Sequence, residues 1–400
     1  MKEVFPKPSF SLHLKQRLQV IRGLQQEYRQ RLNHSLQEQV AIELGLHERT
    51  DVIASSARLV FHDTETNHPL PAGTTIVQVY DRAQFGLLIL GKPGAGKTTL
   101  LLDLALELLR RAENDQEHPL PIVLSLSSWG TRKLPFARWL QEQMYLVYGI
   151  AKKVGAAWIE QDLILFLLDG LDEMDISARS ACVVAMNGHR AEHFVPLVVS
   201  SRSQEYEQQH ARLILPVAIE IQPLEPAEVM TYLAQAGPTL ATARAAIQTN
   251  ATLQQLMTTP LMLMILLLSY RNQNTNKLAQ VGSLEDQQRL IFQHYVQRML
   301  ERHHHRRTIS QPRLLRSLRW LAQNMQKRHL TEFYLEQLQP TWLPTKQVQT
   351  IYHWFYGLFM GLLVGLSMGF MGLLTTAALL LNKKDRKETP LIHFYPLLHL

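Results

Sequence analysis

The chain has 400 residues, of which 46% are hydrophobic and 19% are charged, and its formal net charge is +7. This composition excludes a largely disordered protein, and the length exceeds what one hydrophobic core commonly supports, so we expect two or three structural units. A single cysteine, Cys182, excludes an intrachain disulfide and agrees with a reducing compartment. The basic charge suits an anionic partner such as a nucleotide, a nucleic acid or a lipid headgroup, without choosing among them.

The first part of the chain is predicted to be helical. Residues 8–48 carry apolar side chains at helical spacing between charged and glutamine-rich faces. A loop rich in Asn, Pro, Gly and Thr, residues 64–75, separates this segment from the next apolar run. We therefore assign residues 1–75 to an N-terminal helical module with a linker.

Strands and helices alternate in the next part of the chain. The predicted strands are 86–90, 122–126, 164–168, 197–201 and 218–221, and the helices between them are 97–111, 135–148 and 178–191. Buried apolar strands joined by helices indicate a doubly wound parallel α/β sheet, which we assign to residues 76–222. Helical periodicity alone continues after this sheet and predicts a C-terminal helical domain over residues 223–350.

The sequence GKPGAGKT matches the phosphate-loop pattern G-x-x-x-x-G-K-[ST], and it stands between a predicted strand and a predicted helix, as that pattern requires. The glycines let backbone N–H groups wrap phosphates, Lys97 reaches the β and γ oxygens, and Thr98 offers an oxygen ligand to Mg²⁺. The motif predicts a P-loop NTPase that binds nucleotide through Gly91, Lys92, Pro93, Gly94, Ala95, Gly96, Lys97, Thr98 and Thr99.

Three acids follow the apolar run 163–168, in the sequence LILFLLDGLDE. The carboxyl ends of parallel strands border the ligand crevice, so Asp169 is predicted to hold Mg²⁺ together with Thr98. Glu173 is our candidate for the base that orients or deprotonates the attacking water, and Asp172 is a second catalytic candidate. The alternative is that Asp172 and Glu173 only cap the following helix.

The run PLVVSSRSQEY ends a further predicted strand with polar residues. Arg202 follows that strand directly and is placed to sense a γ-phosphate, while Ser200 or Ser201 is placed to hold water. A structural salt bridge is the alternative role for Arg202.

Taken together, these elements resemble the NACHT family of signal-transduction NTPases, which are relatives of the AAA-type ATPases. The resemblance spans residues 84–300 and rests on GKPGAGKTT (91–99), LLDGLDE (167–173), SSR (200–202), QPLEPAEVMTYL (222–233) and TTPLML (258–263). It implies that Pro260 lies close to the nucleotide base, that adenine is the base bound, and that the resting protein holds ADP.

The resemblance thus predicts a regulatory switch that binds and slowly hydrolyses ATP with Mg²⁺. It also implies a homo-oligomer and a protein effector that the sequence does not identify. The segments 124–129 and 333–343 look like those of large bacterial members of the family. Two alternatives stay open: an AAA-like remodelling motor acting on nucleic acid or protein, with nucleic acid less favoured, and a binding module that has lost catalysis.

A long uncharged segment, Trp354–Leu381, lies near the C-terminus. It exceeds the roughly 20 residues that a membrane-spanning helix needs, so we predict a transmembrane segment over residues 351–382 and a basic tail over 383–400. Glycines at every fourth position leave a stripe without side chains, which favours close helix association. The expected location is the cell membrane, with the NTPase domain cytoplasmic. The alternative is a buried terminal helix, and the basic tail leaves the topology open.

Overall fold

The computed structural model describes most of the chain. The described residues are 10–33, 59–62, 67–71, 73–83, 86–132, 134–193, 196–235, 240–270, 283–302, 310–327, 342 and 346–383. They divide into two compact units, Met1–Thr331 and Glu332–Leu400. The predicted boundaries at residues 75 and 222 lie inside the first unit, and the second part of the predicted helix 8–48, after Asn33, lies outside the described residues.

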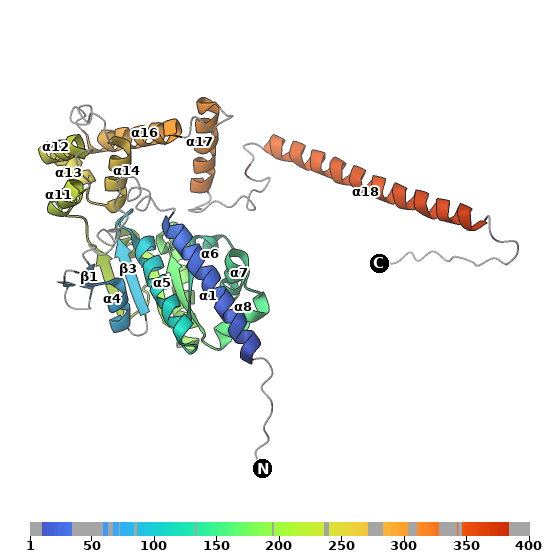
Figure 1. Ribbon diagram of the computed structural model, residues 1–400, viewed down its shortest axis with the longest axis horizontal. Coiled ribbons are helices and arrows are strands. Elements are labelled where there is room, and N and C mark those ends of the chain that lie inside the picture. Colours follow the sequence, from blue (N-terminus) through green and yellow to red (C-terminus); the bar gives the residue numbers. More distant parts are fainter. Residues whose placement is uncertain are drawn as a thin grey trace, which may run out of the picture. The chain divides into compact units, whose positions relative to one another are not determined.

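A mixed sheet forms the centre of the first unit (Figure 1). Its strand order is β2-β1-β7-β3-β6-β5-β4, with every pair from β7 to β4 parallel. The parallel strands are β3 (Gly86–Gly91), β4 (Leu120–Ser125), β5 (Ile164–Asp169), β6 (Leu197–Ser201) and β7 (Val217–Ile221). The parallel pairing confirms the predicted α/β sheet. Strands β3, β5 and β6 are apolar runs buried along their length, as expected for strands covered on both faces.

Two short strands extend the sheet beyond the prediction. Strand β1 (Leu59–His62) pairs antiparallel with β7, and β2 (Asn67–Pro69) pairs antiparallel with β1. The prediction of a loop over residues 64–75 was therefore wrong for β2. Its sequence, NHP, has none of the apolar or β-branched residues that mark a strand, and only pairing with a neighbouring strand makes it one.

Helices cover the sheet on both faces. The connection from β3 to β4 crosses the sheet in one direction and that from β5 to β6 in the other, so right-handed crossovers place α5 and α9 on opposite faces. The helices of this part are α4 (Ile76–Ala83), α5 (Lys97–Asn114), α6 (Ser127–Arg132), α7 (Phe136–Tyr148), α8 (Lys152–Glu160), α9 (Ile176–Glu192) and α10 (Ser203–Glu207), with a short 3-10 turn at Leu171–Glu173.

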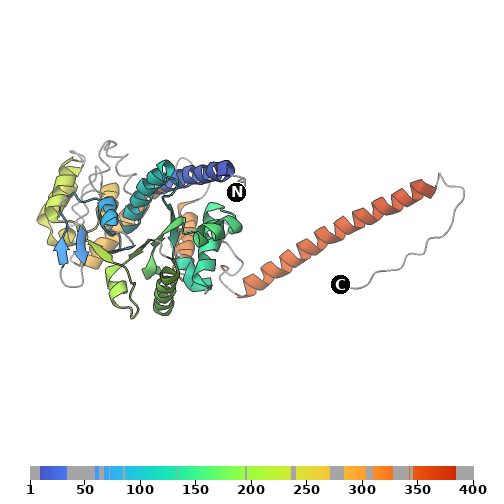
Figure 2. The same cartoon turned by 90° about the horizontal axis from the view of Figure 1, so that it is seen from below.

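The N-terminal helix α1 (Phe10–Asn33) is part of the same hydrophobic core as the sheet. It lies beside α5 in Figures 1 and 2. Its Tyr28 is fully buried, and the Tyr28 hydroxyl accepts a hydrogen bond from the Val123 N–H at 2.9 Å and donates to the Pro121 carbonyl at 3.3 Å. Strand β4 is the outer strand of the sheet, so this side chain satisfies backbone groups that no further strand pairs.

A second hydrophobic core holds most of the helices that follow the sheet. Helix α14 is apolar on every side, and its residues Met262–Tyr270 are buried, as expected of a helix without a polar face. Helix α16 packs against it. The helices of this region are α11 (Pro226–Gln235), α12 (Ala241–Thr249), α13 (Ala251–Leu256), α14 (Pro260–Tyr270), α16 (Leu284–Arg302) and α17 (Gln311–Lys327).

The second unit contains one long helix, α18 (Lys346–Lys383), drawn in red in Figure 1. Within Lys346–Thr376 an 18-residue stretch has a mean hydropathy of 2.0 and none of that stretch is buried, so by length and composition the helix is apolar enough to cross a membrane. The predicted span Trp354–Leu381 lies within this helix. Residues 384–400, which contain nearly all of the predicted basic tail, lie outside the described part of the chain.

Candidate functional site

The phosphate loop connects β3 directly to α5. Gly94 and Gly96 have φ angles of +73° and +97°, in the left-handed region that glycine adopts without steric cost. The Ala95 N–H donates to the Lys92 carbonyl at 3.1 Å and closes the turn. Glycine at these two positions thus allows the chain to turn between the strand and the helix, and the N-terminal N–H groups of α5 face the resulting pocket.

Lys97 is the first residue of α5, and its ammonium group folds back over the loop. Nζ donates to the carbonyls of Gly91 and Lys92 at 2.9 and 3.1 Å. Burial lowers the pKa of Lys97 from its ordinary value, while the negative charges of Asp172 and Asp169 oppose that shift. A partly desolvated cation beside loop carbonyls is chemically suited to exchange those carbonyls for phosphate oxygens.

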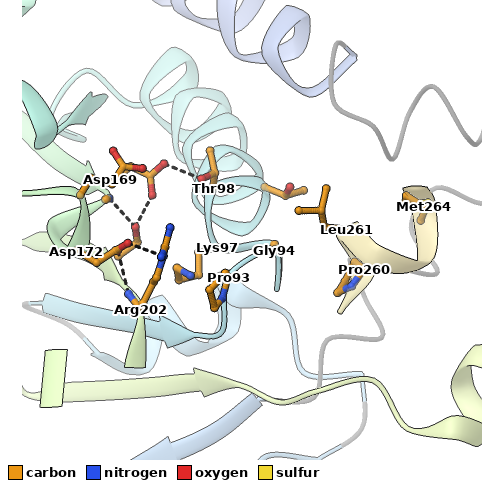
Figure 3. A pocket seen from close by; sticks show the side chains of 15 residues that line it. Pro93, Gly94, Lys97, Thr98, Asp169, Asp172, Arg202, Pro260, Leu261 and Met264 are labelled. Carbon is orange, nitrogen blue, oxygen red and sulfur yellow. Dashed lines mark hydrogen bonds and ion pairs between the residues drawn. The ribbon is translucent and has the colours of Figure 1, made fainter. Parts of the chain in front are cut away.

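Asp169 lies at the end of β5, where the sequence placed it, and joins two hydroxyl groups (Figure 3). The Thr98 hydroxyl donates to Asp169 Oδ2 at 2.7 Å. Ser200, which is fully buried at the end of β6, donates to the other carboxylate oxygen and accepts the Gly170 N–H at 3.0 Å. The carboxylate is therefore fixed from both sides.

These groups fit a magnesium ion. Thr98 and Asp169 present the hard oxygen donors that Mg²⁺ prefers, at the mouth of the phosphate loop. Within the described residues no group of three or more His, Cys, Asp or Glu side chains could hold a metal alone. Mg²⁺ is commonly bound through one or two protein oxygens together with substrate phosphates and water.

Asp172 and Arg202 form an ion pair across the pocket. The guanidinium Nε of Arg202 lies 2.8 Å from Asp172 Oδ2, and the backbone N–H of Arg202 donates to Asp172 Oδ1 at 3.0 Å. Arg202 also contacts Glu205 at 3.3 Å, and its side chain is 43% exposed against 5% for Asp172. The N-cap of the following helix is Asp175, so Asp172 holds Arg202 in place and does not cap that helix.

Glu173 reaches the same pocket through the turn at Gly170. The φ of Gly170 is +76°, and a Cβ at this position would lie 2.6 Å from Cδ of Glu173. The carboxyl group of Glu173 therefore lies back over Gly170. Only glycine leaves room for this arrangement.

The opposite wall of the pocket comes from the start of α14, a helix of the second core (Figure 3). The Leu261 N–H donates to the Gly94 carbonyl at 3.3 Å, and a Cβ on Gly94 would lie 2.7 Å from the Leu261 Cβ. Pro260 opens this helix, as the missing N–H of proline permits, and Met264 lies one turn further on.

The structure thus brings nearly all the predicted site residues around one cavity of about 420 Å³. Gly91, Lys92 and Ala95 belong to the loop but do not line the cavity. Sequence reasoning missed Leu261 and Met264 as site residues. The one sequence signal that these two residues line the pocket is their proximity to Pro260. Apolar residues at the start of a helix otherwise look like ordinary core residues.

A strand, a phosphate loop closed by Lys97 and Thr98, and a carboxylate at the end of a neighbouring strand define a P-loop NTPase. The family model of the NACHT domain matches residues 86–239. The chain therefore contains a NACHT domain. No curated protein matches the chain.

Two solved structures show partial likeness to the chain. The structure of Caenorhabditis elegans PCH-2 is 14% identical with a TM-score of 0.27, and the match covers 54% of this chain and 62% of PCH-2. The crystal structure of Saccharomyces cerevisiae RIF2 is 9% identical with a TM-score of 0.31, and the match covers 64% of this chain and 93% of RIF2. The chain thus matches less than two thirds of the length of PCH-2.

Proposed function

We propose that this protein is a nucleotide-dependent switch that binds ATP with Mg²⁺, hydrolyses it slowly and is held at a membrane by α18. The observation that carries the proposal is the contact of Thr98 with Asp169 directly beside the phosphate loop. These are the groups that a magnesium-bound nucleotide requires, and the NACHT domain match covers all of them.

Each residue has a distinct proposed role. Lys97 exchanges the carbonyls of Gly91 and Lys92 for β and γ oxygens, and Thr98 with Asp169 holds the metal. Glu173 orients or deprotonates the attacking water. Bound Mg²⁺ supplies positive charge that neutralises the developing charge on the phosphates. Arg202, held by Asp172, faces the position of the γ-phosphate and is the proposed sensor of that group.

The contact between Leu261 and Gly94 supports the switch. The carbonyl that Leu261 binds belongs to the loop that wraps the phosphates, so a change in that loop acts directly on the first turn of α14. Most of α14 is buried in the second core, so α14 and the helices packed on it would move together. Pro260 and Met264 are the proposed contacts for the base, for which adenine is the choice that the family resemblance implies.

The test begins with full-length protein purified in detergent. The sample is denatured, the released nucleotide is identified by chromatography, and phosphate release is measured with and without DNA. Retained ADP with slow, DNA-independent turnover supports the switch. An empty site with fast, DNA-stimulated hydrolysis would show instead a remodelling motor.

Two variants test the assigned roles. Lys97→Ala is expected to abolish nucleotide retention, and unchanged retention would contradict the role of the loop. Glu173→Gln is expected to retain nucleotide and lose turnover, because the amide keeps the size of the side chain but cannot accept a proton. Exposed Lys153→Ala, on α8, is the control for the lysine variant.

The membrane proposal rests on α18, which is apolar and exposed over Lys346–Thr376. Membranes from cells that produce the full chain are washed with alkaline carbonate, which removes peripheral proteins. A chain that stays in the pellet and dissolves only in detergent supports a spanning helix. Release of the chain by the wash contradicts it.

A further inference from the structure

Helix α17 (Gln311–Lys327) has two chemically different faces. Its sequence, QPRLLRSLRWLAQNMQK, contains four cations and no acid. At 100° per residue, the cations Arg313, Arg316, Arg319 and Lys327 lie on one side of the helix. The opposite side is apolar, and its residues are Leu314, Leu315, Leu318, Leu321, Ala322 and Met325.

The described part of the protein does not bury this apolar face. No residue of α17 is buried, and Leu315 and Leu318 are 42% and 46% exposed. No other described helix or strand packs extensively against α17. In α14, by contrast, every residue from Met262 to Tyr270 is buried. Helix α17 therefore has the composition of an amphipathic helix that needs an apolar partner from outside the described fold.

We propose that α17 lies in the interface of an anionic lipid bilayer, with its leucines at the acyl boundary and its arginines at the headgroup phosphates. A basic polar face opposite an apolar face is the pattern of helices that lie flat in a membrane interface. The charges are complementary, since α17 offers cations only and an anionic leaflet offers phosphates and carboxylates.

The position of α17 in the chain agrees with this partner. Residues 328–345 connect α17 to α18, and a connection of that length spans up to about 60 Å. If α18 crosses a bilayer, as proposed above, that bilayer is within reach of α17. The inference rests on the proposed tether for this proximity, whereas its recognition chemistry comes from α17 alone.

Two other partners fit less well. A second copy that docked through its own α17 would bring four more cations to a helix without acids. A nucleic acid would neutralise the cations but leave Leu315 and Leu318 exposed to water. Of these three partners, only an anionic membrane surface satisfies both faces at once.

The experiment uses the full chain in nanodiscs made of phosphatidylcholine alone or of phosphatidylcholine with phosphatidylserine. Hydrogen–deuterium exchange is followed in peptides from α17 and, separately, from α18. We expect exchange in α17 to be about tenfold slower in the anionic discs, where the interfacial helix is ordered. High salt should reduce this protection, because it screens the attraction between arginine and headgroup.

Variants separate the two faces. The triple variant R313Q/R316Q/R319Q is expected to lose the added protection in anionic discs. Its control, R22Q/R29Q/R244Q, removes the same charge from exposed arginines on α1 and α12 and should behave as the unchanged protein. The variant L315Q/L318Q keeps every cation and is also expected to lose protection, because it removes the apolar side chains that face the acyl boundary. Both leucines are exposed and belong to neither hydrophobic core.

Several results would overturn the proposal. Equal protection in both kinds of disc, or protection that survives R313Q/R316Q/R319Q, removes the role of charge. Protection that appears in detergent without lipid and rises with protein concentration assigns the face to a second copy, and protection given by DNA without lipid assigns it to nucleic acid. Failure of the tether is seen separately as rapid exchange in α18, and failure of the switch as absent nucleotide, while the α17 comparison stays readable in both cases.

Discussion

Replacing Asp169 by Asn tests the metal-side carboxylate without changing its size. In the protein, one carboxylate oxygen accepts from Thr98 at 2.7 Å and the other accepts from Ser200. Ser200 donates its proton to Asp169 while it accepts a hydrogen bond from the Gly170 N–H, so a residue 169 that offers Ser200 an acceptor keeps both hydrogen bonds. The amide of Asn would therefore turn its oxygen to Ser200 and its NH₂ group to Thr98. The Thr98 oxygen would then accept a hydrogen bond and lose a lone pair that a metal needs.

The size of the effect follows from this geometry. The variant loses one negative charge beside the metal, and its amide occupies a lone pair of Thr98, the second protein ligand. The loss of binding free energy corresponds to about 1.5–3 kcal/mol, the size of a charge-assisted interaction. We expect the affinity for ADP with Mg²⁺ to fall about 10–100-fold. The affinity for ADP in EDTA should change by less than about twofold, because Lys97 and the loop are untouched.

Isothermal titration of the full chain with ADP, in Mg²⁺ and in EDTA, measures both quantities. Asp162→Asn is the control. It removes the same charge from a carboxylate that pairs with His193 and does not line the pocket. An equal loss of affinity in Mg²⁺ and in EDTA, or no loss in either, would refute the assignment of Asp169 to the metal.

Three further predictions concern stability and the turn that holds Glu173. Tyr28→Phe should lower the free energy of unfolding by about 2 kcal/mol, measured in urea, because the buried Val123 N–H loses its acceptor. Burial, together with the charge of a neighbouring histidine, lowers the pKa of His189 to about 4, below the ordinary value of 6.5. The unfolded chain binds this proton more readily, so His189 contributes stability above pH 6.5 that is lost as the pH falls toward 4. The free energy of unfolding should fall by about 1–2 kcal/mol over this range, after allowance for solvent screening. Urea unfolding should show a smaller loss in His189→Gln. Gly170→Ala should displace Glu173, whose Cδ would lie 2.6 Å from the new Cβ, and phosphate release should fall about 10–100-fold with nucleotide retained.

Matched variants control these experiments. Tyr80→Phe removes a hydroxyl that makes no hydrogen bond to any described residue, and Gly188→Ala adds a Cβ where nothing lies within 4 Å. A Tyr28→Phe variant as stable as the unchanged chain would contradict the role given to α1. An unchanged stability profile between pH 6.5 and 4 in His189→Gln, or full turnover in Gly170→Ala, would contradict the other two predictions.

The phosphate loop, the parallel strands and the terminal apolar helix were predictable because each is encoded in a short stretch. GKPGAGKT specifies its own turn chemistry, and the apolar runs of β3, β5 and β6 have few alternatives to burial. The order of motifs after buried strands also predicted that Asp169 and Arg202 would lie at one edge of the sheet, since the carboxyl ends of parallel strands share an edge.

Local sequence did not specify contacts made between distant segments. Strand β2 exists only through its pairing with β1. Helix α1 is tied to the sheet by the hydrogen bond between the Tyr28 hydroxyl and the Val123 N–H of β4, two residues that lie 95 positions apart in the chain. The ion pair of Arg202 with Asp172 joins two loops, and apolar Leu261 gives no sign in the sequence that it reaches Gly94.

The sequence by itself determined the class of protein, because the phosphate loop and its flanking strand and helix form a local unit. It also determined which segments are apolar enough for a core or a membrane. Only the tertiary structure decided how Asp169, Ser200 and Thr98 share their protons, and that α14 forms one wall of the pocket. The reason is physical: turn and burial preferences act over a few residues, whereas hydrogen bonds across the pocket depend on how separate elements pack.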